Sequence, residues 1–166
     1  MRAALLVGFC FLLTACGFHL RGTAVLPFET LYISFPQGHP IGTDLRRLIS
    51  SGTSTRLVDS PKKAQAILEI ISVTNDRNIM SVSGGGRVRE FELRYRVSFR
   101  LMDANGTELI PTSEIVLQRI MPFTDAQAVA KEGEEAMLVR EMQSDSAAQI
   151  LRRLEAVKTA EVNKVP

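Results

Sequence analysis

The stretch EFELRYRVSFRLM, residues 90–102, decides the fold, because polar and apolar side chains alternate along it. Its odd positions are Phe91, Leu93, Tyr95, Val97, Phe99 and Leu101, and its even positions are Glu90, Glu92, Arg94, Arg96, Ser98 and Arg100. A period of two places successive side chains on opposite faces of an extended chain. The stretch therefore predicts a long antiparallel strand with one face on a core and one charged face.

The segment that follows predicts the strand's first neighbour. Asn105-Gly106 suits the positive φ of a tight hairpin, and residues 107–120 return as the next strand. Pro111 cannot donate a backbone hydrogen bond, so it predicts a bulge or an edge at the start of this return.

The segment that precedes the alternating stretch predicts a second neighbour. AILEIISVT, residues 66–74, is apolar on both alternations apart from Glu69, which is typical of a strand at the centre of a sheet. A polar segment then runs to Ser83 and meets the triple glycine at 84–86, which forms a flexible turn.

Two helices complete the prediction. Apolar residues recur at helical spacing over residues 41–49, with Thr43 as N-cap and Gly52 as C-cap, between short strands at 30–35 and 56–58. A longer helix runs to Leu154, and it begins at a capping box that Thr124 forms with Gln127; Gly133 is a point where it could kink. The fold class is α+β: a two-layer sandwich of a mixed sheet of about four strands, with both helices on one face.

The N-terminus reads as an export signal. Arg2 precedes an apolar run at residues 3–13 that is too short to span a bilayer, and Leu13-Thr14-Ala15-Cys16 has the form of a bacterial lipobox. We expect residues 1–15 to be a lipoprotein signal peptide, Cys16 to carry acyl chains that hold the protein on a membrane, residues 16–157 to form one domain, and residues 158–166 to be a disordered tail.

Composition excludes several classes of protein. Without Arg2, Lys plus Arg falls from 20 to 19 against 18 acidic residues, so charge gives no indication of a nucleic-acid partner. His19 and His39 lack metal-ligand spacing, and acylation of Cys16 leaves no thiol nucleophile, since Cys10 is removed with the signal. The paired carboxylates Glu90 with Glu92 and Glu134 with Glu135 are expected to lie in solvent. From these observations together we expect that the protein is not an enzyme and binds no metal and no cofactor.

A basic surface remains as the candidate binding site. Arg87, Arg89, Arg94, Arg96 and Arg100 lie around the triple glycine and the alternating strand. Arginine at a strand tip suits recognition of phosphate, which an anionic lipid head group would supply. Alternatively, the arginines at 94, 96 and 100 keep one face of the sheet in water and pair with acids on neighbouring strands.

Two stretches carry a resemblance to a known family. Residues 16–22, CGFHLRG, and residues 128–154, AVAKEGEEAMLVREMQSDSAAQILRRL, are similar to the start and the last helix of the LptE family of lipopolysaccharide-assembly lipoproteins. The resemblance implies an outer-membrane lipoprotein that plugs and helps to assemble LptD, the β-barrel that inserts lipopolysaccharide, and that binds lipopolysaccharide through basic residues.

Carried over by position, the family's lysine at the start of the last helix is Lys131, whose alternative role is an exposed ion pair with Glu135. Gly84 occupies the place of the family's basic loop residue, and Arg87 is the nearest substitute. Arg89 is a further candidate for binding lipopolysaccharide. With a polar barrel lumen as partner, the face of Arg94, Arg96 and Arg100 becomes an expected interface. The competing expectation is an adaptor lipoprotein on the periplasmic side that binds peptidoglycan or another protein.

Overall fold

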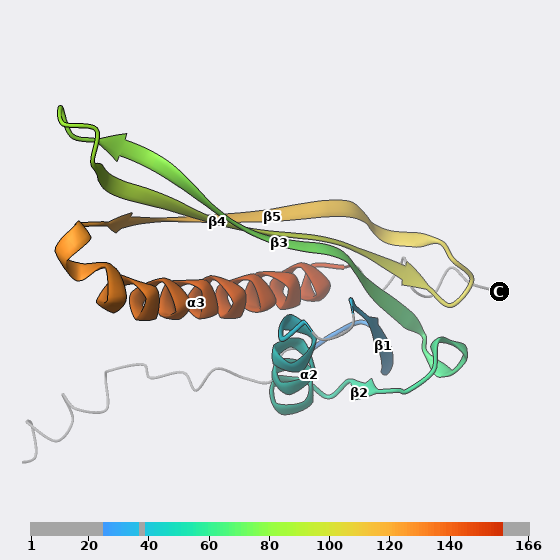
Figure 1. Ribbon diagram of the computed structural model, residues 1–166. Helices are drawn as coiled ribbons and strands as arrows, with labels where there is room; N and C mark the ends of the chain where they lie inside the picture. Colours follow the sequence, from blue (N-terminus) through green and yellow to red (C-terminus); the bar gives the residue numbers. More distant parts are fainter. Residues whose placement is uncertain (1–24, 37–38, 158–166) are drawn as a thin grey trace, which may run out of the picture.

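The computed structural model describes residues 25–36 and 39–157, so the predicted signal peptide, Cys16 and the predicted tail lie outside the described residues. Figure 1 shows a long sheet with two helices beneath it. The elements are β1 (Thr30–Ser34), α2 (Ile41–Gly52), β2 (Arg56–Leu57), a 3₁₀ turn (Pro61–Lys63), β3 (Ala66–Val82), β4 (Val88–Asp103), β5 (Glu108–Pro122), a 3₁₀ turn (Asp125–Gln127) and α3 (Ala128–Glu155).

The sheet is mixed, and its strand order is β2-β1-β3-β4-β5. β1 runs parallel to β2 and β3, whereas the β3–β4 and β4–β5 pairs are antiparallel. The predicted α+β class is confirmed, with five strands in place of about four; the smallest of them, β2, has only two residues.

The alternation along β4 has the expected structural result. Five of its inner positions are buried at 1% exposure or less, namely Leu93, Tyr95, Val97, Phe99 and Leu101. α2 covers this face with Ile41, Leu45 and Ile49, and α3 covers it with Met142, Ala147, Ile150 and Leu154. The core therefore lies between the middle of β4 and the two helices.

β3 is longer than its apolar pattern indicates. The sequence predicts a strand at 66–74 followed by a polar segment, but β3 continues to Val82 and pairs with β4 over that whole length. The strand extends through the polar segment because the backbone ladder with β4 needs no apolar side chains. A bulge between Ile70 and Ser72 shifts the register, so odd-numbered residues face inward beyond it.

Both predicted ends of α2 and the possible kink in α3 need correction. α2 begins at Ile41, so Thr43 lies inside the helix; the ring Nδ1 of His39 accepts the Ile41 N–H at 3.3 Å in place of a Thr cap. Gly52 is the last helical residue and Thr53 the C-cap. α3 runs unbroken past Gly133 because its i to i−4 bonds tolerate one exposed glycine.

The predicted capping box is not formed. The Thr124 hydroxyl bonds the Gln127 side chain at 3.1 Å, but no side chain caps the backbone of the 3₁₀ turn or of α3. The predictions for the other turns are confirmed: Gly106 closes the β4–β5 hairpin with a φ of 87°, and the ladder is irregular opposite Pro111.

Candidate functional site

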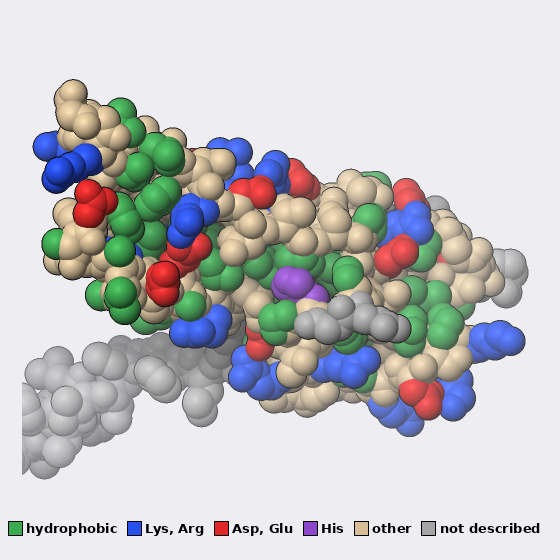
Figure 2. Space-filling model, viewed as in Figure 1, with side chains coloured by type: hydrophobic (Ala, Val, Ile, Leu, Met, Phe, Trp, Pro, Cys, Tyr) green, Lys and Arg blue, Asp and Glu red, His purple; other side chains and the backbone are tan. Residues whose placement is uncertain are grey.

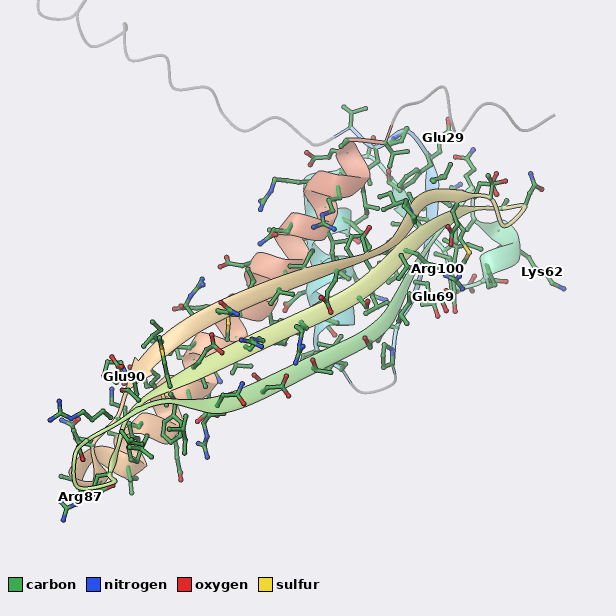
Figure 3. All side chains as sticks on the ribbon, turned by 90° about the horizontal axis from the view of Figure 1, so that it is seen from above. Glu29, Lys62, Glu69, Arg87, Glu90 and Arg100 are labelled. Atoms are coloured by element: carbon green, nitrogen blue, oxygen red, sulfur yellow. The ribbon has the colours of Figure 1, made fainter. Side chains whose placement is uncertain are left out.

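The β3–β4 hairpin brings the predicted basic loop next to the start of α3. Its turn is closed by the bond from the Ser83 N–H to the Arg87 carbonyl at 2.7 Å, and Gly86 supplies the positive φ of 76°. The Phe123 N–H donates to the Arg89 carbonyl at 2.7 Å, and the Arg87 guanidinium lies 3.9 Å from Asp125. We call this region, residues 79–91 with residues 120–131, the hairpin end; Figure 3 labels Arg87 there.

Aromatic contacts fix the hairpin end against α3. The rings of Phe91 and Phe123 meet edge to face with centroids 5.1 Å apart. The guanidinium of Arg77 lies 4.9 Å from the centroid of Phe91 and also bonds Glu135 of α3 at 2.8 Å. The loop therefore has a defined position relative to the helix start.

Large apolar side chains are exposed at the same end. They are Ile79 at 60%, Met80 at 54%, Val82 at 56%, Ile120 at 54% and Val129 at 85%. The space-filling view shows green surface reaching the projecting tip, with blue cationic groups beside it (Figure 2). These apolar groups and cations share one end of the molecule but not one face of the sheet, because Ile79 lies opposite Phe91 of the inner face and Ile120 lies opposite Glu92 of the outer face. Apolar groups and cations at one end suit an amphiphile with an anionic head group better than they suit a purely polar ligand.

Sequence reasoning missed this apolar half of the site. The pattern places Ile79 and Met80 in the polar segment before the triple glycine, and it places Val129 in the last helix without indicating that its side chain is exposed. The one local signal is the Ile79-Met80 pair shortly before the triple glycine.

The three predicted phosphate-binding residues differ in their availability. The side chain of Arg87 is 81% exposed, and Arg89 is also exposed. Lys131 is only 15% exposed, and its Nζ lies 2.6 Å from Glu134. The predicted pairing of Lys131 with Glu135 was wrong, because Glu135 is taken by Arg77 from β3.

The predicted interface arginines lie on the outer face of the sheet, and each one is ion-paired. Arg96 meets Asp76 at 2.5 Å and Arg100 meets Glu69 at 2.6 Å, both across the β3–β4 ladder. Figure 3 shows Glu69 beside Arg100. Arg94 instead pairs along its own strand with Glu92 at 2.7 Å. The outer face is therefore a charge-paired surface that remains partly exposed to solvent.

The carboxylates of the two predicted pairs, Glu90 with Glu92 and Glu134 with Glu135, contact side chains of the protein itself. Glu90 accepts from the Ser81 hydroxyl at 2.7 Å, and Glu134 and Glu135 are held by Lys131 and Arg77. Within residues 25–36 and 39–157, no group of three or more His, Cys, Asp or Glu side chains is placed to hold a metal ion. No described helix combines the length and apolarity needed to cross a bilayer.

Polar side chains of α2, α3 and β4 lie close together beneath the sheet. The Gln143 amide of α3 donates to the Asp44 carboxylate of α2. The Tyr95 hydroxyl is buried without a hydrogen-bond partner among the described residues, and burial, followed by the charge of Asp44, raises the pKa of Tyr95. The phenol therefore stays neutral, and the Gln143–Asp44 hydrogen bond joins the two helices.

Comparison with known proteins identifies the family. The model of the family described as "LptE: Lipopolysaccharide-assembly" matches residues 28–154. The chain belongs to the LptE family. Proteins named LPS-assembly lipoprotein LptE from Yersinia pestis and Yersinia pseudotuberculosis are 32% identical over 165 residues, covering 95% of this chain and 77% of the relative.

Solved structures agree with the LptE-family assignment. A solution structure of an uncharacterized lipoprotein B from Nitrosomonas europaea is 49% identical, has a TM-score of 0.75, and covers 84% of this chain and 91% of its own. The rare lipoprotein B from Shewanella oneidensis is 26% identical and has a TM-score of 0.67. The match covers 81% of this chain and 97% of the Shewanella chain. The resemblance drawn from residues 16–22 and 128–154 is thereby confirmed at the level of the family.

Proposed function

We propose that this protein is an outer-membrane lipoprotein, anchored through Cys16, whose hairpin end binds lipopolysaccharide during its delivery to the outer leaflet. Membership of the LptE family supports the role in lipopolysaccharide assembly. The observation that carries the site is the placement of exposed Arg87 and Arg89 beside five exposed apolar side chains. Lipopolysaccharide combines phosphates with acyl chains, and the hairpin end offers guanidinium groups for the phosphates and apolar side chains for the acyl chains.

The proposed mechanism is competition for phosphate. Divalent cations bridge the phosphates of neighbouring lipopolysaccharide molecules, and guanidinium groups can replace those bridges through charge-assisted hydrogen bonds. Arg87 and Arg89 would make the first contacts, and Lys131 would join them by exchanging Glu134 for a phosphate. Apolar side chains such as Val129 would then cover acyl chains that leave the aggregate.

The test is a charge-reversal pair with a matched control. Arg87→Glu with Arg89→Glu should weaken lipopolysaccharide binding by about tenfold or more, because each lost charge-assisted bond is worth roughly 1.5–3 kcal/mol. Arg56→Glu with Lys62→Glu makes the same charge change at the opposite end of the molecule, where Figure 3 labels Lys62. Binding of purified protein to labelled lipopolysaccharide gives the affinities.

The outcomes separate a site from a general charge effect. A loss of affinity in the Arg87→Glu, Arg89→Glu variant alone supports the proposal. Equal losses of affinity in both double variants would show that binding depends only on the net charge of the protein. Unchanged affinity in the Arg87→Glu, Arg89→Glu variant would mean that lipopolysaccharide binds elsewhere or not at all.

A second part of the proposal concerns the partner. We propose that the domain sits on the periplasmic side and within the lumen of the lipopolysaccharide-inserting barrel LptD, as plug and assembly factor, with the outer face of β4 against the barrel wall. Barrel lumens are polar, and the partly exposed ion pairs of Arg94, Arg96 and Arg100 offer a polar surface of that kind.

Affinity purification from mildly solubilised outer membranes tests the partner. A tagged wild-type chain should retain a large β-barrel in a one-to-one ratio. Alanine at all three of the interface arginines should lower that yield, while alanine at Arg46, Arg47 and Arg140 on the helices should not. Retention of cell-wall fragments without a barrel would favour the adaptor function and exclude the plug.

A further inference from the structure

Most of the far edge of β3 has no neighbouring strand. β1 pairs with β3 only over residues 66–69, whereas β3 continues to Val82. Between the bulges near Ile71 and Met80, Ser72–Ile79 forms a regular ladder with β4 on one side only. In an antiparallel pair, every second residue directs both its N–H and its C=O away from the partner strand. No backbone or side-chain bond within the described residues reaches those outward groups.

The other open edge of the sheet is protected, and β3 is not. β5 carries Pro111 and Pro122, and Arg153 of α3 donates to its Glu114 carbonyl at 3.3 Å. Prolines and charged side chains of this kind prevent a further strand from pairing. Residues 72–79, SVTNDRNI, contain neither proline nor lysine, and their two charged side chains are already ion-paired.

A groove accompanies the unprotected edge. It has a volume of about 470 Å³ and lies between Asn75 and Arg77 of β3 and the N-terminal half of α3. Ala136 and Val139 give it apolar walls, and Glu132 and Glu135 give it carboxylates. Arg77 neutralises Glu135, but Glu132 forms no ion pair within the described part of the chain, so the groove keeps a negative charge.

We propose that an extended segment of a partner protein, with alternating apolar and cationic side chains, adds as a strand to Ser72–Ile79 of β3. Its backbone would satisfy the outward groups of β3, which is how strand addition obtains affinity. Its side chains on one face would fill the groove, with a cation near Glu132. A second copy of this chain fits less well, because its own β3 brings Asp76 and Arg77 and therefore no excess of positive charge.

A peptide of repeated Val-Lys units is the probe, added to the full chain in detergent and observed by amide NMR. Alternate amides within residues 72–79 should become protected from exchange, and the amides of β5 should not change. A Val-Glu repeat should not bind. A Val-Lys repeat with prolines at alternate valines keeps the charge but cannot pair, so equal binding of that peptide would overturn the proposal.

Two substitutions on the same strand locate the contact. Asn75→Lys places a cation in the groove and should weaken the Val-Lys peptide by about tenfold. Asn78→Lys adds the same charge on the opposite face, opposite Glu92, and should leave affinity unchanged. Equal weakening by both would show bulk charge repulsion and would overturn the proposal.

Two further outcomes keep this inference separate from the lipopolysaccharide site. Protection of the same amides that appears with rising protein concentration and no peptide would assign the edge to self-association, against the proposal. The Arg87→Glu, Arg89→Glu variant should bind the peptide normally, because its substitutions lie outside Ser72–Ile79 and the groove. The two proposals can therefore fail independently.

Discussion

At the level of single residues, His39 makes the stability of the start of α2 depend on pH. Its Nδ1 accepts the Ile41 N–H at 3.3 Å, a bond that needs the unprotonated nitrogen. Burial lowers the pKa of His39 from its ordinary value of 6.5. The folded state therefore binds this proton less readily than the unfolded chain does, so the favourable contribution is present above the unfolded pKa and is lost as pH falls below it.

We predict that His39→Gln flattens the pH dependence of stability. The wild-type free energy of unfolding should decrease more steeply than that of the variant between about pH 7 and pH 5, because only the wild type has an imidazole that binds a proton more readily in the unfolded chain than in the folded one. Urea denaturation at a series of pH values measures both slopes. Parallel slopes would mean that the carboxylates alone set the acid response.

The arginines show which residue-level properties a sequence conveys. The alternation predicted that Arg94, Arg96 and Arg100 share one face, and they do. Their partners depend on the neighbouring strand: Asp76 and Glu69 come from β3, and their positions opposite β4 follow from a bulge that no local pattern indicates. Lys131 is similar, because Arg77 takes Glu135 and leaves Glu134 to the lysine.

At the level of elements, two helical glycines have opposite surroundings. A Cβ at residue 42 of α2 would lie 2.5 Å from the ring of Phe35, which Arg46 covers with its guanidinium 5.1 Å from the ring centroid. A Cβ at Gly133 of α3 would meet nothing within 4 Å. The first glycine permits a close approach, and the second only weakens its helix.

We predict opposite effects of alanine at these positions. Gly133→Ala should raise the free energy of unfolding by about 1 kcal/mol through helix propensity. Gly42→Ala has the same gain but must displace Phe35, an overpacking cost of roughly 1–3 kcal/mol, so its net effect should be a loss. Urea denaturation of both variants measures the free energy of unfolding. Equal increases in both variants would contradict the prediction and would mean that the Phe35 ring moves aside freely.

At the level of the whole molecule, the core is concentrated at one part of a long sheet. The inner residues of β4 from Leu93 to Leu101 are buried under both helices, whereas the β3–β4 hairpin projects beyond them (Figure 1). Buried contacts decrease toward the tip, where Ile79 and Val82 are exposed. Local opening should follow this gradient.

We predict a corresponding gradient of hydrogen exchange. Ladder amides of residues 93–101 should exchange only through global unfolding, while those of residues 80–90 should exchange through local opening at lower free energy. Native-state exchange at increasing denaturant concentration measures both classes. Equal opening free energies along β4 would show that the aromatic contacts of Phe91 and Phe123 join the tip to the global unit.

The sequence by itself determined the face of β4 that is buried, the two helices, the class of the fold and the family, because periodicity and motif are local properties of the chain. Only the tertiary structure decided how far β3 extends, which carboxylate holds each arginine or lysine, and where exposed apolar residues gather. Those features depend on strand register and on the crossing of α3 beneath the sheet, which join residues far apart in sequence. Even the free edge of β3 follows from the shortness of β1, which sets where pairing stops.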